Sequence, residues 1–224
     1  MGQRALFVLT SHGELGDTGR PTGFHLGETS LPWQELTAAG HRIDLASVEG
    51  GRPPMVGHDP EQPSEVAFLA DPLVQVALGT TIPADEVDPG NYRLVYFVGG
   101  HGGMWDFHGN SVLHTIARSV YEAGGVVAAI CHGPAVLVDL ELSDGSRLVT
   151  GKWVTSFPEV DEAARGLDIV VPFSLQGALE DSGAFYSSGP DKTAHVVTDG
   201  RLITGQNPAS AAKLARCLVD VWNR

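Results

Sequence analysis

Short runs of apolar and β-branched residues alternate along the chain with longer segments of mixed polarity. Four of these runs predict buried strands, over residues 5–10 (ALFVLT), 42–47 (RIDLAS), 94–98 (LVYFV) and 126–130 (VVAAI). Amphipathic segments predict helices over residues 26–39 and 111–123, each followed by a glycine suited to a left-handed cap. Strands that are apolar on both faces are typical of a parallel sheet covered by helices. The order therefore predicts an α/β fold, a doubly wound, mostly parallel sheet sandwiched by helices.

The rest of the chain predicts a hairpin, a last helix and an insertion. Residues 195–205 (HVVTDGRLITG) predict a β-hairpin that turns at an Asp-Gly pair, and residues 209–222 predict a C-terminal helix. Residues 49–91 are acidic and rich in proline and glycine, and they predict an excursion from the sheet with short helices near residues 64–69 and 72–79. This insertion is interpreted equally well as a pocket wall or a solvated connection. With no repeat or linker, residues 1–224 are expected to form one domain.

Composition and charge exclude some classes of binding partner. The chain has 224 residues and a net charge of −13, from 14 Lys and Arg against 27 Asp and Glu. This charge argues against nucleic acid and against an anionic membrane surface, because both require clustered basic residues. No apolar run reaches the roughly 18–20 residues of a membrane-spanning helix, and the first apolar run is too short for a signal peptide. Two cysteines form no disulfide framework, so we expect a reducing, cytoplasmic location.

Cys131 is the strongest candidate for chemistry. It follows the strand over residues 126–130 directly and precedes His132, a Gly-Pro pair and a helix predicted from about Gly133. This order is typical of a nucleophile elbow at the carboxyl edge of a sheet. We expect the start of the helix to lower the pKa of the thiol. The alternative is a small buried hydrophobic residue, which is how we interpret Cys217 in the C-terminal helix.

Other polar groups are expected at the same edge of the sheet. His132 can approach the thiol at a sharp turn, and it then needs a carboxylate to fix its tautomer. The GGHGG loop follows the strand over residues 94–98, and the N–H groups of Gly100 and His132 could form an oxyanion hole. Glu28 lies among apolar residues, where a carboxyl group beside a thiol would have a raised pKa. An acid that complements the helix dipole is the simpler interpretation of Glu28.

Together these segments resemble the ThiJ/PfpI superfamily, whose flavodoxin-like fold is that of class I glutamine amidotransferases. The resemblance covers most of the chain, from TGFHLGETSLPW through VYFVGGHGGMWDF and AAICHGPAVL to SFPEVDE and QNPASA. The GGHGGMWD segment, the acidic insertion and the NPASA ending are similar to the subgroup of stress-inducible chaperones and glyoxalase III enzymes.

The resemblance implies roles for particular residues. Glu28 would hydrogen-bond the nucleophile Cys131, and an acid after the Phe-Pro pair would complete a triad with His132. Glu162 is our first choice for that acid and Asp161 our second, whereas Glu159 is interpreted as solvated. We also expect substrate contacts from four further residues, namely Gly99, His101, Trp105 and His25. The family often has an aromatic residue or an extra acid where His25 and Gly27 stand, a departure that would alter the pocket.

The resemblance also implies an activity, the conversion of a small carbonyl compound, methylglyoxal, to lactate without a cofactor. The thiolate of Cys131 would attack the aldehyde, and His132 or Glu28 would remove the proton from that carbon. A cysteine amidase or peptidase with the same triad is an alternative. So is a holding chaperone or redox sensor, in which Cys131 is oxidised to a sulfinic acid. No metal-binding motif is present among the nine histidines, so no metal is expected, and a homodimer is expected by resemblance.

Overall fold

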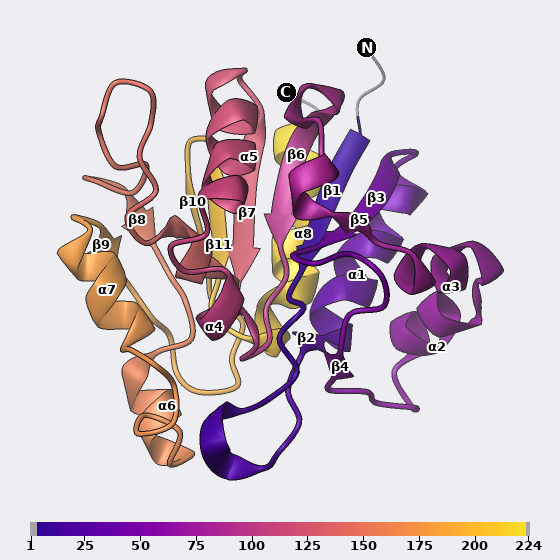
Figure 1. Ribbon diagram of the computed structural model, residues 1–224, viewed down its shortest axis with the longest axis horizontal. Coiled ribbons are helices and arrows are strands. Elements are labelled where there is room, and N and C mark those ends of the chain that lie inside the picture. The colour runs from indigo at the N-terminus through magenta and orange to yellow at the C-terminus, as the bar shows by residue number, and fades with distance from the viewer. Residues whose placement is uncertain (1–3, 223–224) are drawn as a thin grey trace.

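The structure is a computed structural model that describes residues 4–222. A seven-stranded sheet runs through it in the order β10-β11-β7-β6-β1-β3-β5 (Figure 1). All neighbouring strands in it are parallel except β10 and β11. Its strands are β1 (Arg4–Leu9), β3 (Arg42–Ser47), β5 (Ile82–Pro83), β6 (Tyr92–Phe97), β7 (Val126–Ile130), β10 (Val196–Asp199) and β11 (Leu202–Gly205). The prediction of a doubly wound α/β fold is confirmed.

Two apolar cores lie on opposite faces of the sheet because successive residues of a strand point to opposite sides. In β1, Phe7 packs in the core shared with α1 (Leu26–Ala38) and α8 (Ala211–Trp222). Leu6 and Val8 pack in the other core, with the apolar face of α5 (Ser111–Glu122). A strand buried on both faces must be apolar at every position, which is why the unbroken run in β1 predicted its place.

The segments outside these layers follow the predicted order with two differences. The hairpin of β10 and β11 and the short helices α2 (Pro63–Ala70) and α3 (Pro72–Gly79) are confirmed. The insertion is not wholly an excursion, because β5 returns to the sheet and pairs with β3. The helix expected from about Gly133 is only a 3-10 turn over Gly133–Leu137.

Short elements complete the description. Two small parallel sheets lie beside the main one, formed by β2 (Phe24–His25) with β4 (Met55–Val56) and by β8 (Trp153–Val154) with β9 (Phe185–Tyr186). The remaining helices are α4 (Gly103–Asp106), α6 (Glu159–Ala164) and α7 (Leu175–Asp181), with further 3-10 turns at Gly16–Thr18, Ala84–Glu86, Pro89–Asn91 and Pro208–Ser210. None of the helices within residues 4–222 has the length and apolar character needed to cross a membrane.

Candidate active site

Cys131 occupies a strained turn between β7 and the 3-10 turn that follows. Its backbone has a φ of +58°, in the left-handed region that residues with a Cβ adopt at a cost of about 1–3 kcal/mol. Hydrogen bonds fix both of its peptide groups, from its N–H to the carbonyl of Gly205 (2.8 Å) and from the N–H of Phe157 to its carbonyl (2.8 Å). These contacts hold the strain and place a thiol that is 5% exposed at the carboxyl end of the strand, as the nucleophile-elbow interpretation predicted.

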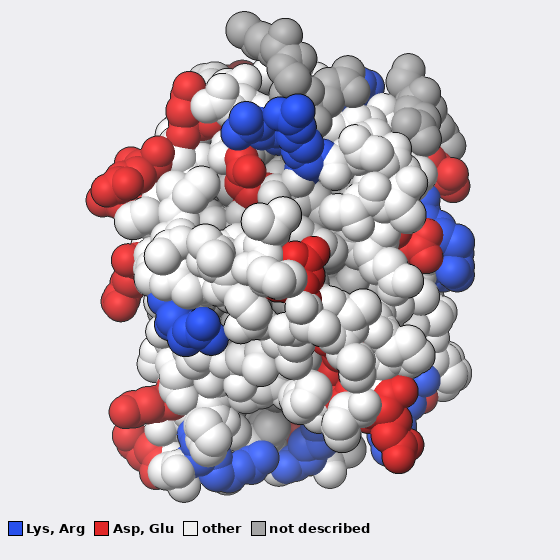
Figure 2. Space-filling model, turned by 90° about the vertical axis from the view of Figure 1, so that its right-hand side faces the viewer, with Lys and Arg blue, Asp and Glu red and all other residues white. Residues whose placement is uncertain are grey.

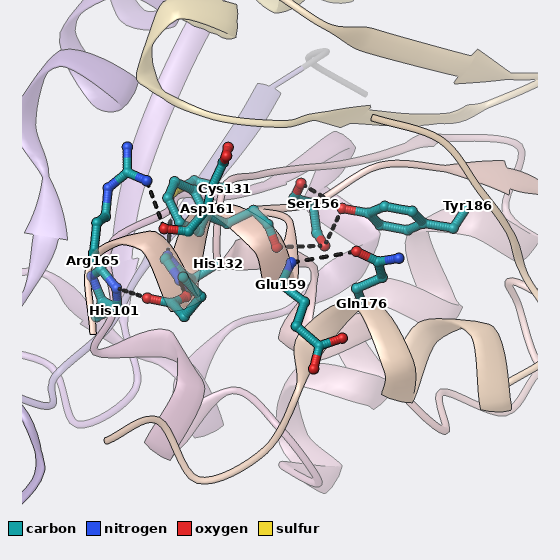
Figure 3. Close-up of polar contacts among 11 residues, drawn as sticks. His101, Cys131, His132, Ser156, Glu159, Asp161, Arg165, Gln176 and Tyr186 are labelled. Carbon is teal, nitrogen blue, oxygen red and sulfur yellow. Dashed lines mark hydrogen bonds and ion pairs between the residues drawn. The ribbon is translucent and has the colours of Figure 1, made fainter. Parts of the chain in front are cut away.

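The side chains of His132, Glu162 and His101 converge beside this thiol. Nδ1 of His132 lies 3.3 Å from Sγ of Cys131, and its Nε2 lies 2.6 Å from Oε2 of Glu162. The other carboxylate oxygen of Glu162 lies 2.8 Å from Nε2 of His101, so one carboxylate contacts two imidazoles (Figure 3). Asp161, the second choice for the acid, does not hydrogen-bond His132; the guanidinium of Arg165 donates to its backbone carbonyl, 2.7 Å away.

Glu28 lies beside the thiol and comes from the first turn of α1. Its carboxyl group is fully buried, and neither oxygen meets a hydrogen-bond partner of good geometry among residues 4–222. Gly99 leaves the space between the two side chains, because a Cβ there would overlap Oε2 of Glu28 and lie 2.6 Å from Cβ of Cys131. The carbonyl of Gly99 in turn accepts the N–H of His25 (2.9 Å), which ties the glycine loop to the start of α1.

The electrostatics of these groups follow from burial and from their neighbours. Burial raises the pKa of Glu28 to about 8, and the nearby Cys131 thiol and Gly99 N–H offset only part of that rise. Burial, together with the charge of His101, lowers the pKa of His132 to about 4. Burial alone would raise the pKa of Glu162. Hydrogen bonds from the two histidines outweigh this effect and lower the pKa to about 2. A neutral imidazole therefore lies between a thiol and an ionised carboxylate.

The expected lowering of the thiol pKa was wrong. Burial raises the pKa of Cys131 well above its usual value, and the charges of Glu28 and Glu162 raise it further, whereas the N–H of His132 lowers it only slightly. The expected helix dipole is missing because five residues of 3-10 turn follow the cysteine. The thiol therefore stays protonated until a reaction partner or His132 takes its proton.

The four residues expected to bind substrate make different contacts. Gly99 and His101 border the thiol and its histidine, and the charge of His101, after burial, helps to lower the pKa of His25 to about 4. Trp105 lies in α4, directly after the same glycine loop. Its ring stacks on His12, with centroids 4.9 Å apart and planes 10° from parallel.

Most of the chain matches a known family. The model of the DJ-1/PfpI family matches residues 21–221.

The chain belongs to the DJ-1/PfpI family.

Relatives and solved structures agree with this assignment. A glutathione-independent glyoxalase of Saccharomyces cerevisiae is 30% identical over 97% of each chain. The crystal structure of glyoxalase III from Candida albicans superposes with a TM-score of 0.91, at 30% identity over 98% of this chain and 97% of that one. The X-ray structure of a rapid encystment protein of 24 kDa from Francisella tularensis superposes with a TM-score of 0.94, at 34% identity over 98% of each chain.

Three residues of this DJ-1/PfpI chain make notable contacts although the sequence analysis assigned them no role. The Phe157 ring stacks on the His132 ring, with centroids 4.8 Å apart, and the Arg165 guanidinium lies 4.9 Å from the centroid of the same Phe157 ring. Phe157 lies in the SFPEVDE segment just before the acids, but its contact with His132 could not be predicted from that position. Asp106 is the third such residue, since it accepts hydrogen bonds from Thr10 Oγ1 and from the N–H groups of residues 11 and 12.

Cys217, expected in the core, is half-buried on α8 and packs against the core on that face of the sheet. Both cysteines are free thiols, and Cys217 packs against the core that also contains Cys131.

Proposed function

We propose that this protein is a cofactor-independent glyoxalase that converts small 2-oxoaldehydes, such as methylglyoxal, to 2-hydroxy acids. One observation carries the proposal: a thiol lies 3.3 Å from a neutral histidine and beside a buried carboxyl group that has no well-aligned partner. The names of the similar proteins from S. cerevisiae and C. albicans support the same activity. The reaction needs no outside oxidant, because one carbon of the substrate is oxidised while its neighbour is reduced.

The proposed reaction begins with the attack of Cys131 sulfur on the aldehyde carbon. The thiol proton passes to Nδ1 of His132, whose Nε2 proton is held by the Glu162 carboxylate. The aldehyde oxygen becomes an oxyanion, for which the N–H groups of Gly100 and His132 are the proposed donors. Neither N–H donates to a backbone carbonyl among residues 4–222, and the N–H of His132 interacts with the thiol of Cys131.

A proton then moves between the two carbons of the bound substrate. Glu28 is the proposed base, since a pKa of about 8 makes its ionised form a stronger base than an ordinary carboxylate near neutral pH. It removes the proton from the carbon bonded to sulfur, which gives an enediol, and returns a proton to the neighbouring carbon. The resulting thioester reacts with water, which releases the 2-hydroxy acid and restores the thiol. The sum is one 2-oxoaldehyde and one water for each 2-hydroxy acid.

An assay of lactate formation from methylglyoxal, without glutathione, tests the proposal. We expect Cys131→Ala to abolish turnover while its circular dichroism and melting temperature stay close to those of the natural sequence. Cys217→Ala, which alters the other free thiol, is the matched control and should keep full activity. Turnover that survives in Cys131→Ala would refute the proposal. Hydrolysis of amide or peptide substrates in place of 2-oxoaldehydes would favour the amidase alternative.

We further propose that two copies associate in the cytoplasm, through the side of the molecule that carries α2 and α3. Figure 2 shows that this side has a broad area with few charged side chains. Three large apolar residues of these helices are exposed, Val66 (49%), Leu73 (79%) and Val76 (66%). Light scattering coupled to gel filtration should give the mass of a dimer, and Leu73→Asp should shift it to the mass of a monomer. The two free thiols are consistent with a reducing compartment.

A further inference from the structure

His101 is a second imidazole that the proposed Cys-His-acid arrangement does not require. A triad needs one imidazole on its carboxylate, and His132 already fills that place through Oε2 of Glu162. The His101 ring lies only 3.9 Å from the His132 ring, measured between centroids, and takes the remaining oxygen of Glu162. Two imidazole nitrogens therefore lie against the two oxygens of one carboxylate, an arrangement that calls for an explanation beyond the reaction.

We propose that His101, His132 and Glu162 form a binding site for a divalent transition-metal ion, with Zn²⁺ the ion best suited to these donors. One ligand atom from each residue lies within 4.8 Å of the other two. Two histidines and one carboxylate are a ligand set that Zn²⁺ takes in open sites, where water fills the fourth position. This proposal departs from the expectation drawn from the sequence, where no metal was expected because no metal-binding spacing motif is present.

The distances are compatible with such an ion after small movements. In a tetrahedral zinc site with bonds of about 2.0–2.1 Å, neighbouring ligand atoms lie about 3.3 Å apart. The two hydrogen-bonded pairs, at 2.8 and 2.6 Å, would need to open by roughly half an ångström as the ion displaces the protons between them. Rotation of the half-buried His101 side chain can supply this movement, because its side chain is 23% exposed whereas that of His132 is 1% exposed.

The three ligand residues lie on separate segments of the chain, each held in place by the fold. His132 follows the fixed turn at Cys131, Glu162 lies on α6, and His101 lies in the glycine loop between β6 and α4. The ring of Phe157 stacks on His132 and limits its rotation. A site whose ligands are already held near one another loses less conformational entropy when an ion binds.

Metal binding and the proposed reaction would exclude each other. The ion would occupy Nε2 of His132 and the Glu162 carboxylate, the two groups that pass and hold the proton during attack by Cys131. Sγ of Cys131 faces Nδ1 on the other side of the same ring, so the thiol is not a member of the ligand set. We therefore expect Zn²⁺ to inhibit any activity that depends on this histidine, and a chelator to reverse the inhibition.

Titration of the untagged, chelator-treated protein with Zn²⁺ by calorimetry, and with Co²⁺ followed by its visible absorption, tests the site without any turnover. We expect one equivalent of metal per chain. His101→Gln should weaken binding at least about tenfold, because one of three ligands is lost. His108→Gln, at an exposed histidine near the same loop, is the matched control and should bind as the natural sequence does. Equal affinity in His101→Gln and the natural sequence would overturn the proposal, as would the absence of stoichiometric binding.

A second variant separates this site from a thiol-bound ion. Cys131→Ala should keep its affinity for Co²⁺, since sulfur is not among the proposed ligands. Loss of binding in Cys131→Ala, with unchanged binding in His101→Gln, would place the ion on the thiol and refute the proposed site. Circular dichroism of each variant checks that the fold is intact. Because these readouts need no substrate, they stand apart from the test of the proposed glyoxalase activity.

Discussion

The buried carboxyl group of Glu28 should make the stability of this protein fall as the pH rises above the acidic range. Its pKa is about 8 in the folded protein, against 4.5 for the unperturbed group. Between these values the unfolded chain has released the proton that the folded protein still holds. The unfolded state then binds fewer protons, so the free energy of unfolding decreases with pH. The stabilising effect is complete below the unfolded pKa and is lost as the pH rises through the folded pKa.

The size of the effect follows from the two pKa values. At about 1.4 kcal/mol per pH unit, the difference between 4.5 and about 8 corresponds to about 5 kcal/mol over the whole interval. Between about pH 5 and about pH 8, the same two values give a loss of about 3–4 kcal/mol. His132 acts in the opposite direction, because burial lowers its pKa to about 4 and its contribution is lost as the pH falls. Glu28 must therefore be isolated by comparison with a variant.

Glu28→Gln provides that comparison, because it keeps the size of the side chain and removes its titration. Urea unfolding of both proteins at several values from about pH 5 to about pH 8 gives the free energy of unfolding of each. From about pH 5 to about pH 8, we expect the free energy of unfolding of the variant to rise by about 3–4 kcal/mol relative to that of the natural sequence. Any effect of the amide that does not depend on pH shifts the whole curve and leaves this difference unchanged. Glu35→Gln, on the exposed side of the same helix, is the control and should give a curve parallel to that of the natural sequence. If the curve of Glu28→Gln were also parallel to that of the natural sequence, the claim that Glu28 is buried and protonated would be refuted.

Three further substitutions test how the site is held. Gly99→Ala should destabilise the protein by about 1–3 kcal/mol and reduce turnover, since its Cβ would overlap neighbouring side chains; Gly79→Ala, at a position with space, is the control in thermal melts. Glu162→Gln should lower kcat by roughly 10²–10⁴-fold without comparable destabilisation, because His132 loses its carboxylate; unchanged kcat in steady-state assays would contradict that role. Asp106→Asn should weaken the tie between the loop after β1 and α4, seen as faster amide hydrogen exchange at residues 11–12, and unaltered exchange would count against it.

The layers of the fold could be predicted because each rests on a local pattern. β1 is apolar at successive positions since its side chains enter both cores, and the glycines after α1 and α5 take the left-handed conformations that end a helix. The insertion has no such pattern. The two residues of β5 are too short to produce a strand signal, so their return to the sheet was missed.

The candidate site could be predicted only in part, because some of its contacts depend on side-chain direction. The motif around Cys131 located the turn, since a strand followed at once by Cys-His-Gly-Pro leaves few other conformations. Adjacent residues of a helix point about 100° apart, so only one of Asp161 and Glu162 can face His132, and the preference for Glu162 came with the family resemblance. The second contact of Glu162, with His101, joins two segments with no common spacing and was not foreseen.

The error in the thiol pKa has a physical cause that also bears on the proposed chemistry. A helix dipole is a local property that can be anticipated from sequence, whereas burial and nearby acids are properties of the assembled site. Both surround Cys131, so they outweigh the short turn that follows it, and the resting thiol is protonated. A protonated thiol is a weak nucleophile until His132 accepts its proton, which makes the contact of 3.3 Å between them a requirement of the proposed reaction. The same burial that suppresses the thiolate raises the basicity of Glu28, so the two effects on which the proposed proton transfer depends arise from one apolar enclosure.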